Sequence, residues 1–125
     1  MWLELSPRRG IRGRIRIRTP SRGWVSVVRD GKKRLALNVS FFAEYFARAS
    51  HVRVFMNRGE KRLLVRPAYK PDRTTFVLHR RGGQVLVRCS AALKELRTAP
   101  GHYCAEWDGE LRGLVIYLDR GDENA

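Results

Sequence analysis

Cysteine and histidine are scarce in this sequence, which has two cysteines and three histidines among its 125 residues. Cys89 and Cys104 form no C-x-x-C pair, and too few histidines or further cysteines lie near them for a structural zinc site. We therefore expect two reduced thiols. The same scarcity predicts no disulfide framework, no metal site and no bound cofactor.

Long apolar runs are also missing from the sequence. No segment approaches the roughly 20 apolar residues that a membrane-spanning helix needs, and the N-terminal residues MWLELSPRRG lack the apolar core of a signal peptide. We expect no contact with membranes and a cytoplasmic location.

Acidic residues are few, whereas arginine is abundant. Twelve Asp and Glu face 26 Lys and Arg, of which 21 are Arg, and the formal net charge is +14. Residues 1–66 carry a net charge of +13 and residues 67–125 a net charge of +1. A coding bias toward arginine is one explanation, but a bias alone would not divide the charge in this way. The uneven excess predicts a polyanionic partner, for which the guanidinium group suits phosphates and guanine edges.

A weak internal repeat organises the chain. When the sequence is shifted by 50 residues, several residues coincide, and His51 coincides with His102 after a slip of one residue. The coinciding pairs are Val27 and Val77, Ser40 and Ser90, Gly59 and Gly109, Glu60 and Glu110, Arg62 and Arg112, Leu64 and Leu114, and Val65 and Val115. Chance similarity between two β-rich stretches is the alternative explanation.

The first repeat has the pattern of a ββαββ unit. Residues 24–28 and 34–39 are typical of strands and flank a turn with Asp-Gly at its centre, which predicts a hairpin. Ser40 has the place of an N-cap, and apolar residues recur at helical spacing after it, so we expect a helix of two to three turns. Residues 51–56 and 61–67 predict a second hairpin. The expected apolar face of the helix consists of Phe41, Phe42, Tyr45, Phe46 and Ala49.

The second repeat follows the same order, and the chain divides accordingly. We expect a basic arm over residues 1–23, a first unit over 24–67, a linker over 68–74, a second unit over 75–118 and a polar tail over 119–125. One such unit can bury little apolar surface alone. The predicted fold is therefore mainly β with two short helices (α+β), in which two ββαββ units interleave into one barrel-like pseudo-dimer.

The arm contains an alternation of arginine and isoleucine. In a strand, Arg14, Arg16 and Arg18 would share one face at a spacing of roughly 6.5–7 Å, close to the spacing of phosphates along a nucleic-acid strand. An edge strand that uses charge to block aggregation is an equally good interpretation. A third alternative is a basic tail that becomes ordered on binding.

The order of elements in the repeats resembles the swapped-hairpin, AbrB-like fold of transcription factors. The resemblance lies in KRLALN (33–38) followed by VSFFAEYF, and in VRVFMNRGEKRLLVRP (52–67), although Asn38 stands where that family usually has Pro. Members of the family are usually homodimers that bind DNA through basic residues on the first hairpin of each unit. For this chain the resemblance implies a single-chain pseudo-dimer whose DNA-binding residues are Arg29, Lys32, Lys33, Arg34, Arg80, Arg81 and Arg88.

The residues that could support catalysis do not form a recognisable set. His51, His79 and His102 have no acid or cysteine at a spacing typical of catalysis or metal binding. Ser40 and Ser90 have the sequence context of helix caps. The two basic turns, RDGKK (29–33) and RRGG (80–83), lack the spacing of a Walker-A loop. We expect a protein that is not an enzyme.

The sequence therefore favours a DNA-binding regulator or architectural protein. An RNA-binding accessory protein remains an alternative, because the same basic loops suit RNA. Another alternative is an antitoxin-like or inhibitory module that binds an acidic protein surface. A protein partner could also bind the near-neutral second half, through the strand LVIYL (114–118). The chain would act as a monomeric pseudo-dimer or as a homodimer.

Overall fold

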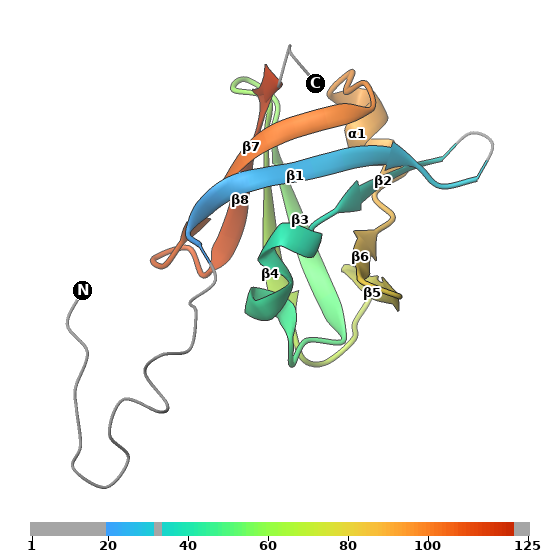
Figure 1. Ribbon diagram of the computed structural model, residues 1–125, viewed down its shortest axis with the longest axis vertical. Helices are drawn as coiled ribbons and strands as arrows, with labels where there is room; N and C mark the ends of the chain where they lie inside the picture. The colour runs from blue at the N-terminus through green and yellow to red at the C-terminus, as the bar shows by residue number, and fades with distance from the viewer. Residues whose placement is uncertain (1–19, 32–33, 122–125) are drawn as a thin grey trace, which may run out of the picture.

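The computed structural model describes residues 20–31 and 34–121, and within them it contains eight strands and two short helices (Figure 1). The first four strands and the first helix are β1 (Arg22–Arg29), β2 (Leu35–Asn38), η1 (Ser40–Phe46), β3 (His51–Asn57) and β4 (Arg62–Ala68). The remaining elements are β5 (Thr75–Arg81), β6 (Gln84–Val87), α1 (Ser90–Glu95), β7 (Gly101–Asp108) and β8 (Gly113–Gly121). The predicted class, mainly β with two short helices, is confirmed.

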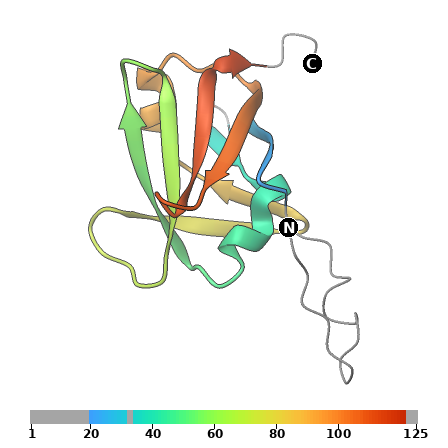
Figure 2. The ribbon, with the colours of Figure 1, turned by 90° about the vertical axis from the view of Figure 1, so that its left-hand side faces the viewer.

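The eight strands form a closed antiparallel barrel in the order β1-β2-β6-β5-β3-β4-β8-β7. Figure 2 shows one wall of it, with β3, β4, β8 and β7 side by side. Four hairpins make up the barrel, and hairpins from the two halves of the chain alternate around it. Closure leaves none of these strands with an unpaired edge, which removes a common route to aggregation.

Three strand boundaries differ from the predicted division of the chain. The smallest difference is that of β4, which continues to Ala68, the first residue of the predicted linker. Strand β1 begins at Arg22, inside the predicted arm, and β8 continues to Gly121, inside the predicted tail. In both places β-sheet pairing with β7 extends the strand, since Arg22 pairs with Glu106 and Gly121 with Tyr103. The predicted residues Arg14, Arg16 and Arg18 of the arm lie outside the described residues.

Alternation along the strands fills the barrel interior. In β1 the side chains of Val25 and Val27 are 1% exposed, whereas that of Trp24, the residue before Val25, is 44% exposed. Successive side chains of a strand point to opposite faces, so one face of each strand supplies the core. In β8 the buried side chains are Leu114, Ile116 and Leu118.

The two helices contribute side chains to the same core as the strands. Helix η1 packs against β1 and β6, and α1 packs against β2. Phe42 and Phe46 of η1 and Leu93 of α1 are fully buried in the main hydrophobic cluster. Trp107 of β7 meets the edge of Phe46 with ring centroids 6.0 Å apart, which is favourable aromatic geometry.

The first helix is not the regular helix that the sequence predicts. It is a 3-10 helix with non-helical dihedral angles at Phe42 (φ −107°, ψ 20°). Phe42, Phe46 and Ala49 are buried as expected, but Phe41 is 49% exposed. The physical reason is that tight turns of three residues per turn cannot keep all five apolar side chains on one face.

Ser40 and Ser90 do not cap their helices, so that prediction was wrong. The Ser40 hydroxyl oxygen accepts the backbone N–H of Val85 at 3.0 Å, and that of Ser90 accepts the N–H of Leu35 at 3.2 Å. Strands β2 and β6 are neighbours, and each serine lies a few residues after the end of one strand and beside the start of the other. Its hydroxyl therefore bonds to the neighbouring strand instead of to its own first turn.

The pairing of strands is repeated in the two halves of the chain. Val25 pairs with Tyr103, and Thr75 pairs with Arg53, so both partners differ by 50 residues between the two pairs. The second hairpins are shifted by one more residue, since the β3–β4 turn lies between Asn57 and Arg62 and the β7–β8 turn between Asp108 and Gly113. The pairing of β7 with β8 is also irregular between Tyr103 and Cys104.

This shift revises part of the repeat. The coincidences at a spacing of 50 residues from Gly59 to Val65 do not fall on equivalent positions of the hairpins. Lys61 and Arg112, 51 residues apart, share the same left-handed conformation, each with φ 52°. Aligning the two halves by their identical residues therefore places the second hairpin one residue away from its structural equivalent.

Candidate nucleic-acid interface

Ten residues were predicted to bind nucleic acid, and the structure describes five of them. Arg14, Arg16 and Arg18 of the arm, and Lys32 and Lys33 of the first turn, lie outside the described residues. The described residues are Arg29, Arg34, Arg80, Arg81 and Arg88. They come from the hairpins β1–β2 and β5–β6 and from the residue that follows β6.

A single carboxylate brings basic residues of both hairpins together. Arg88 donates a hydrogen bond from Nε to Asp30 Oδ2, and the two side chains form an ion pair. This hydrogen bond is the main cause that lowers the pKa of Asp30; partial desolvation opposes it, and the charges of Arg88, Arg81 and Arg34 assist it. Asp30 and Arg34 belong to the first hairpin, whereas Arg81 ends β5. We call Asp30, Arg34, Arg81 and Arg88 the Asp30 cluster.

Three of the predicted arginines are exposed at the two basic hairpins. Within the described part of the chain, the side chains of Arg29, Arg34 and Arg81 have no hydrogen bond or ion pair. Arg29 ends β1 and Arg81 ends β5, so both stand at the bases of the turns. Exposed guanidinium groups of this kind can meet phosphate oxygens with two parallel hydrogen bonds.

Both turns have the local geometry that the sequence predicts. Gly31 has φ +83° and Gly82 has φ +59°, a region that favours glycine over residues with a side chain. The N–H of Asp30 donates to the carbonyl of Arg34 at 2.9 Å and closes the first turn. The space around both glycines is open, since nothing lies within 4 Å of where a Cβ would be.

Arg80 serves the fold in a way that sequence reasoning missed. Its Nη2 donates to the carbonyl oxygens of Phe46 and Ala49, the latter at 3.1 Å. These carbonyls lie at and just after the end of η1, and that of Phe46 also accepts the N–H of Ala49 at 3.0 Å. Arg80 thus holds the end of η1, and Arg88 is paired with Asp30, so both predicted DNA-binding side chains already have partners within the fold. The sequence carries no signal for either contact, since the partners are 31 to 58 residues away.

The other two turns carry ion pairs and self-contained hydrogen bonds. Arg58 pairs with Glu95 of α1, and Arg62 Nη1 lies 2.7 Å from Glu60 Oε2. In the β7–β8 turn, Asp108 Oδ1 accepts the N–H groups of Glu110 and Leu111 at 2.9 and 3.0 Å. The ion pairs neutralise basic charge in the first of these turns, and the Asp108 carboxylate adds negative charge to the second, so both turns are poor candidates for anion binding.

The strand LVIYL directs three of its five side chains into the core. Leu114, Ile116 and Leu118 are at most 4% exposed and fill the barrel, which leaves Val115 and Tyr117 on the outer face. The apolar letters of this strand therefore belong to the core.

The histidines and cysteines form no metal site in the part of the chain that the structure describes, where no group of three potential ligands occurs. The Oγ atoms of Ser26 and Ser50 lie 3.0 and 2.7 Å from the Nδ1 atoms of His102 and His51, respectively. Cys89 is buried and Cys104 partly exposed, and both are free thiols. Burial raises the pKa of the Cys89 thiol to about 11, which keeps it protonated and unreactive.

Replacing Asp30 tests whether its carboxylate limits anion binding by the cluster. Asp30→Asn removes one negative charge and releases Arg88, so it is expected to tighten duplex DNA binding about threefold at low salt. Fluorescence anisotropy of a labelled duplex measures the change. Asp119→Asn on β8 makes the same change of charge away from both hairpins and is expected to have a smaller effect. Weaker binding by Asp30→Asn would mean that Asp30 positions Arg88 instead of neutralising it.

Within the described residues, neither helix has the length and apolar character needed to cross a membrane.

Comparison with known proteins gives no relative for this chain: no protein family, no curated protein and no solved structure matches it.

Proposed function

We propose that this chain is a non-enzymatic nucleic-acid-binding protein, with DNA favoured over RNA, that acts as a transcriptional regulator or an architectural protein. The observation that carries the proposal is the Asp30 cluster, which gathers basic side chains of two hairpins far apart in sequence. Arg34, Arg81 and Arg88 all lower the pKa of this one carboxyl group, so three positive charges act on a single negative one. Such an excess attracts a polyanion and increases its rate of association.

Phosphate neutralisation is the proposed mechanism. Arg29, Arg34 and Arg81 would contact phosphate oxygens, assisted by Lys32, Lys33 and the arginines of the arm. Each contact releases condensed counterions from the nucleic acid, so the affinity falls steeply as salt rises. Contacts of some arginines with guanine edges would add sequence preference.

We further propose that the barrel is an internal duplication, a single-chain pseudo-dimer of ββαββ units that resembles the AbrB-like fold. Three observations support the duplication. The strand order is unchanged when the two halves are exchanged, the register of β1 with β7 is repeated by β5 with β3, and Ser40 and Ser90 make reciprocal bonds. Under this proposal the two basic hairpins are equivalent, as are the two DNA-binding hairpins of an AbrB-like dimer.

The cytoplasm is the proposed location, since free thiols are the state that a reducing compartment maintains.

A comparison of nucleic acids tests the proposal. The full chain is titrated into labelled duplex DNA, duplex RNA and single strands of one length, at several salt concentrations, with anisotropy as the readout. We expect the tightest binding for duplex DNA, with a steep salt dependence. Preference for duplex RNA would make the protein an RNA-binding accessory protein. Weak binding to every nucleic acid would overturn the proposal and leave the interaction module with an acidic protein surface as the function to test.

A further inference from the structure

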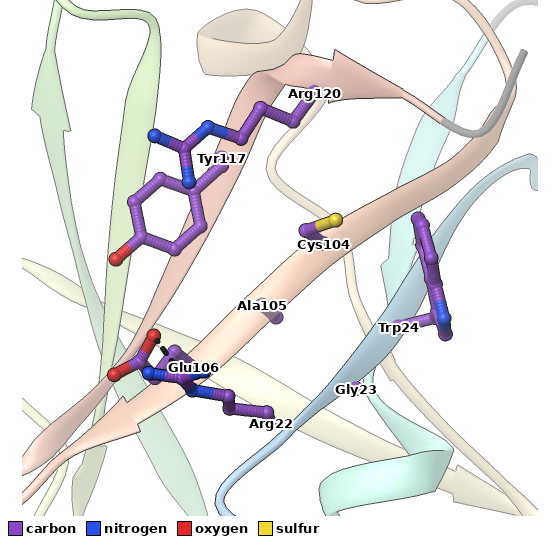
Figure 3. Close-up of a pocket in the computed structure, with 8 residues that line it drawn as sticks. All are labelled: Arg22, Gly23, Trp24, Cys104, Ala105, Glu106, Tyr117 and Arg120. Carbon is purple, nitrogen blue, oxygen red and sulfur yellow. Dashed lines mark ion pairs between the residues drawn. The ribbon is translucent and has the colours of Figure 1, made fainter.

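A groove on the outer face of β1, β7 and β8 lies apart from the Asp30 cluster (Figure 3). Its volume is about 420 Å³, within the range of roughly 300–1,000 Å³ that is usual for small-molecule sites. Trp24 pairs with Cys104 across β1 and β7, and Cys104 pairs with Tyr117 across β7 and β8. The three side chains thus form one row on the same face of the sheet.

Within this row a small side chain separates two aromatic ones. Neighbouring strands are about 4.8 Å apart, so Trp24 and Tyr117 stand about 10 Å apart at their backbones. Figure 3 shows Trp24 and Tyr117 on opposite sides of Cys104. Trp24 is 44% exposed, whereas Trp107 is stacked on Tyr45 with ring centroids 4.2 Å apart. An exposed indole beside a gap is available to stack on a planar group.

Arginines surround the aromatic row. The Arg120 guanidinium carbon lies 4.7 Å from the centre of the Tyr117 ring, and that of Arg62 lies at the same distance. At the other end of the groove Arg22 Nε lies 3.5 Å from Glu106 Oε2, and the Arg22 side chain is 81% exposed. Because Glu106 is paired in this way, Arg120 gives the groove a net positive charge.

We propose that this groove is a site for an unpaired base of single-stranded nucleic acid. The base stacks on Trp24, and the phosphates beside it lie near Arg22 and Arg120. A planar aromatic ring accepts any base, and flanking arginines follow the backbone, which is the arrangement that single-strand-binding surfaces use. Trp24, Tyr117 and Arg120 take no part in the proposed duplex interface, so this site stands independently of it.

A single-stranded oligomer of 12 thymidines and an abasic oligomer of the same length test the site. Both carry the same phosphates, and only the first has bases that can stack. Stacking on one aromatic ring strengthens binding by about fivefold to 150-fold. We therefore expect the thymidine oligomer to bind at least about fivefold tighter than the abasic one, as measured by anisotropy.

Substitutions then assign this preference to residues. Trp24→Ala is expected to remove it, and Trp24→Phe to keep part of it. Arg120→Gln is expected to weaken both oligomers by a similar factor, because it removes a phosphate contact. Phe55→Ala is the matched control, since Phe55 is also 44% exposed but lies on β3, and it should leave the preference unchanged. Far-UV circular dichroism confirms that each variant is folded.

Two results would overturn the site. Equal binding of the two oligomers by the unaltered protein would show that bases do not stack, and would leave a peptide as the occupant to test. An unchanged preference in Trp24→Ala would place stacking elsewhere on the chain. Neither result depends on duplex DNA, so failure here is distinguishable from failure of the hairpin interface.

Discussion

Changing Arg29, Arg34 and Arg81 together to Gln is expected to weaken duplex DNA binding by about 100-fold near 0.1 M salt. These arginines are exposed at the two basic hairpins, where three phosphate contacts would be lost at once. Each neutralised phosphate contributes about 0.9 to the slope of log affinity against log salt, so the slope should fall by about 3. Anisotropy titrations of one duplex at four salt concentrations measure both quantities.

A charge-matched variant separates a local interface from overall attraction. Lys70, Arg73 and Arg112 are exposed and lie in the linker and in the β7–β8 turn. Their joint change to Gln lowers the net charge by the same amount and is expected to weaken binding less than about threefold. Equal losses in the two variants would mean that net charge, not the hairpin face, governs binding. An unaffected first variant would exclude the face as the interface.

Local patterns in the sequence predicted most of the strands. The composition of residues 24–28 predicted the first strand, and the Asp30-Gly31 pair predicted the first turn, since both signals lie within a few residues of one another. The second hairpins also followed from their turns. The turn residues and the register of a hairpin depend on residues close together in the sequence, so local patterns can predict them.

The closed barrel, and the contacts between residues far apart in the sequence, could be predicted in outline only. The order β1-β2-β6-β5 requires strands some 50 residues apart to pair, and no local pattern specifies such a partner. The same applies to the bond between Ser40 and Val85. A serine before an apolar run is an equally good sequence signal for a helix cap and for this longer contact, so tertiary structure decides between them.

The sequence predicted where the basic residues of the candidate site lie, but not which residues they contact within the fold. The sequence identified the two basic turns, because dense arginine is visible without a fold. It could not reveal that Asp30 attracts Arg88 or that Arg80 holds the end of η1, since both contacts join separate hairpins. Within the described chain, the residues that we propose to contact DNA are therefore Arg29, Arg34 and Arg81. Arg88, which is paired with Asp30, is a secondary candidate.

The second large effect concerns the helix that Arg80 holds. Phe46 is fully buried and contacts Trp107 edge-on, so Phe46→Ala leaves a cavity in the core and is expected to lower the free energy of unfolding by about 3–5 kcal/mol. Domains of this size are stable by about 5–15 kcal/mol, so the variant should be close to unfolding at 37 °C. Urea denaturation followed by far-UV circular dichroism measures the loss.

Phe41→Ala in the same helix is the matched control for this substitution. Phe41 is 49% exposed and packs over Gly23, so the same change of side chain should cost only about 1 kcal/mol. Similar losses for the two variants would contradict the placement of η1 in the core. The loss of Phe46 is also expected to affect function, because Arg80 of β5 donates hydrogen bonds to carbonyls at the end of η1. Loss of Phe46 should loosen the β5–β6 hairpin and weaken DNA binding even at temperatures where Phe46→Ala remains folded.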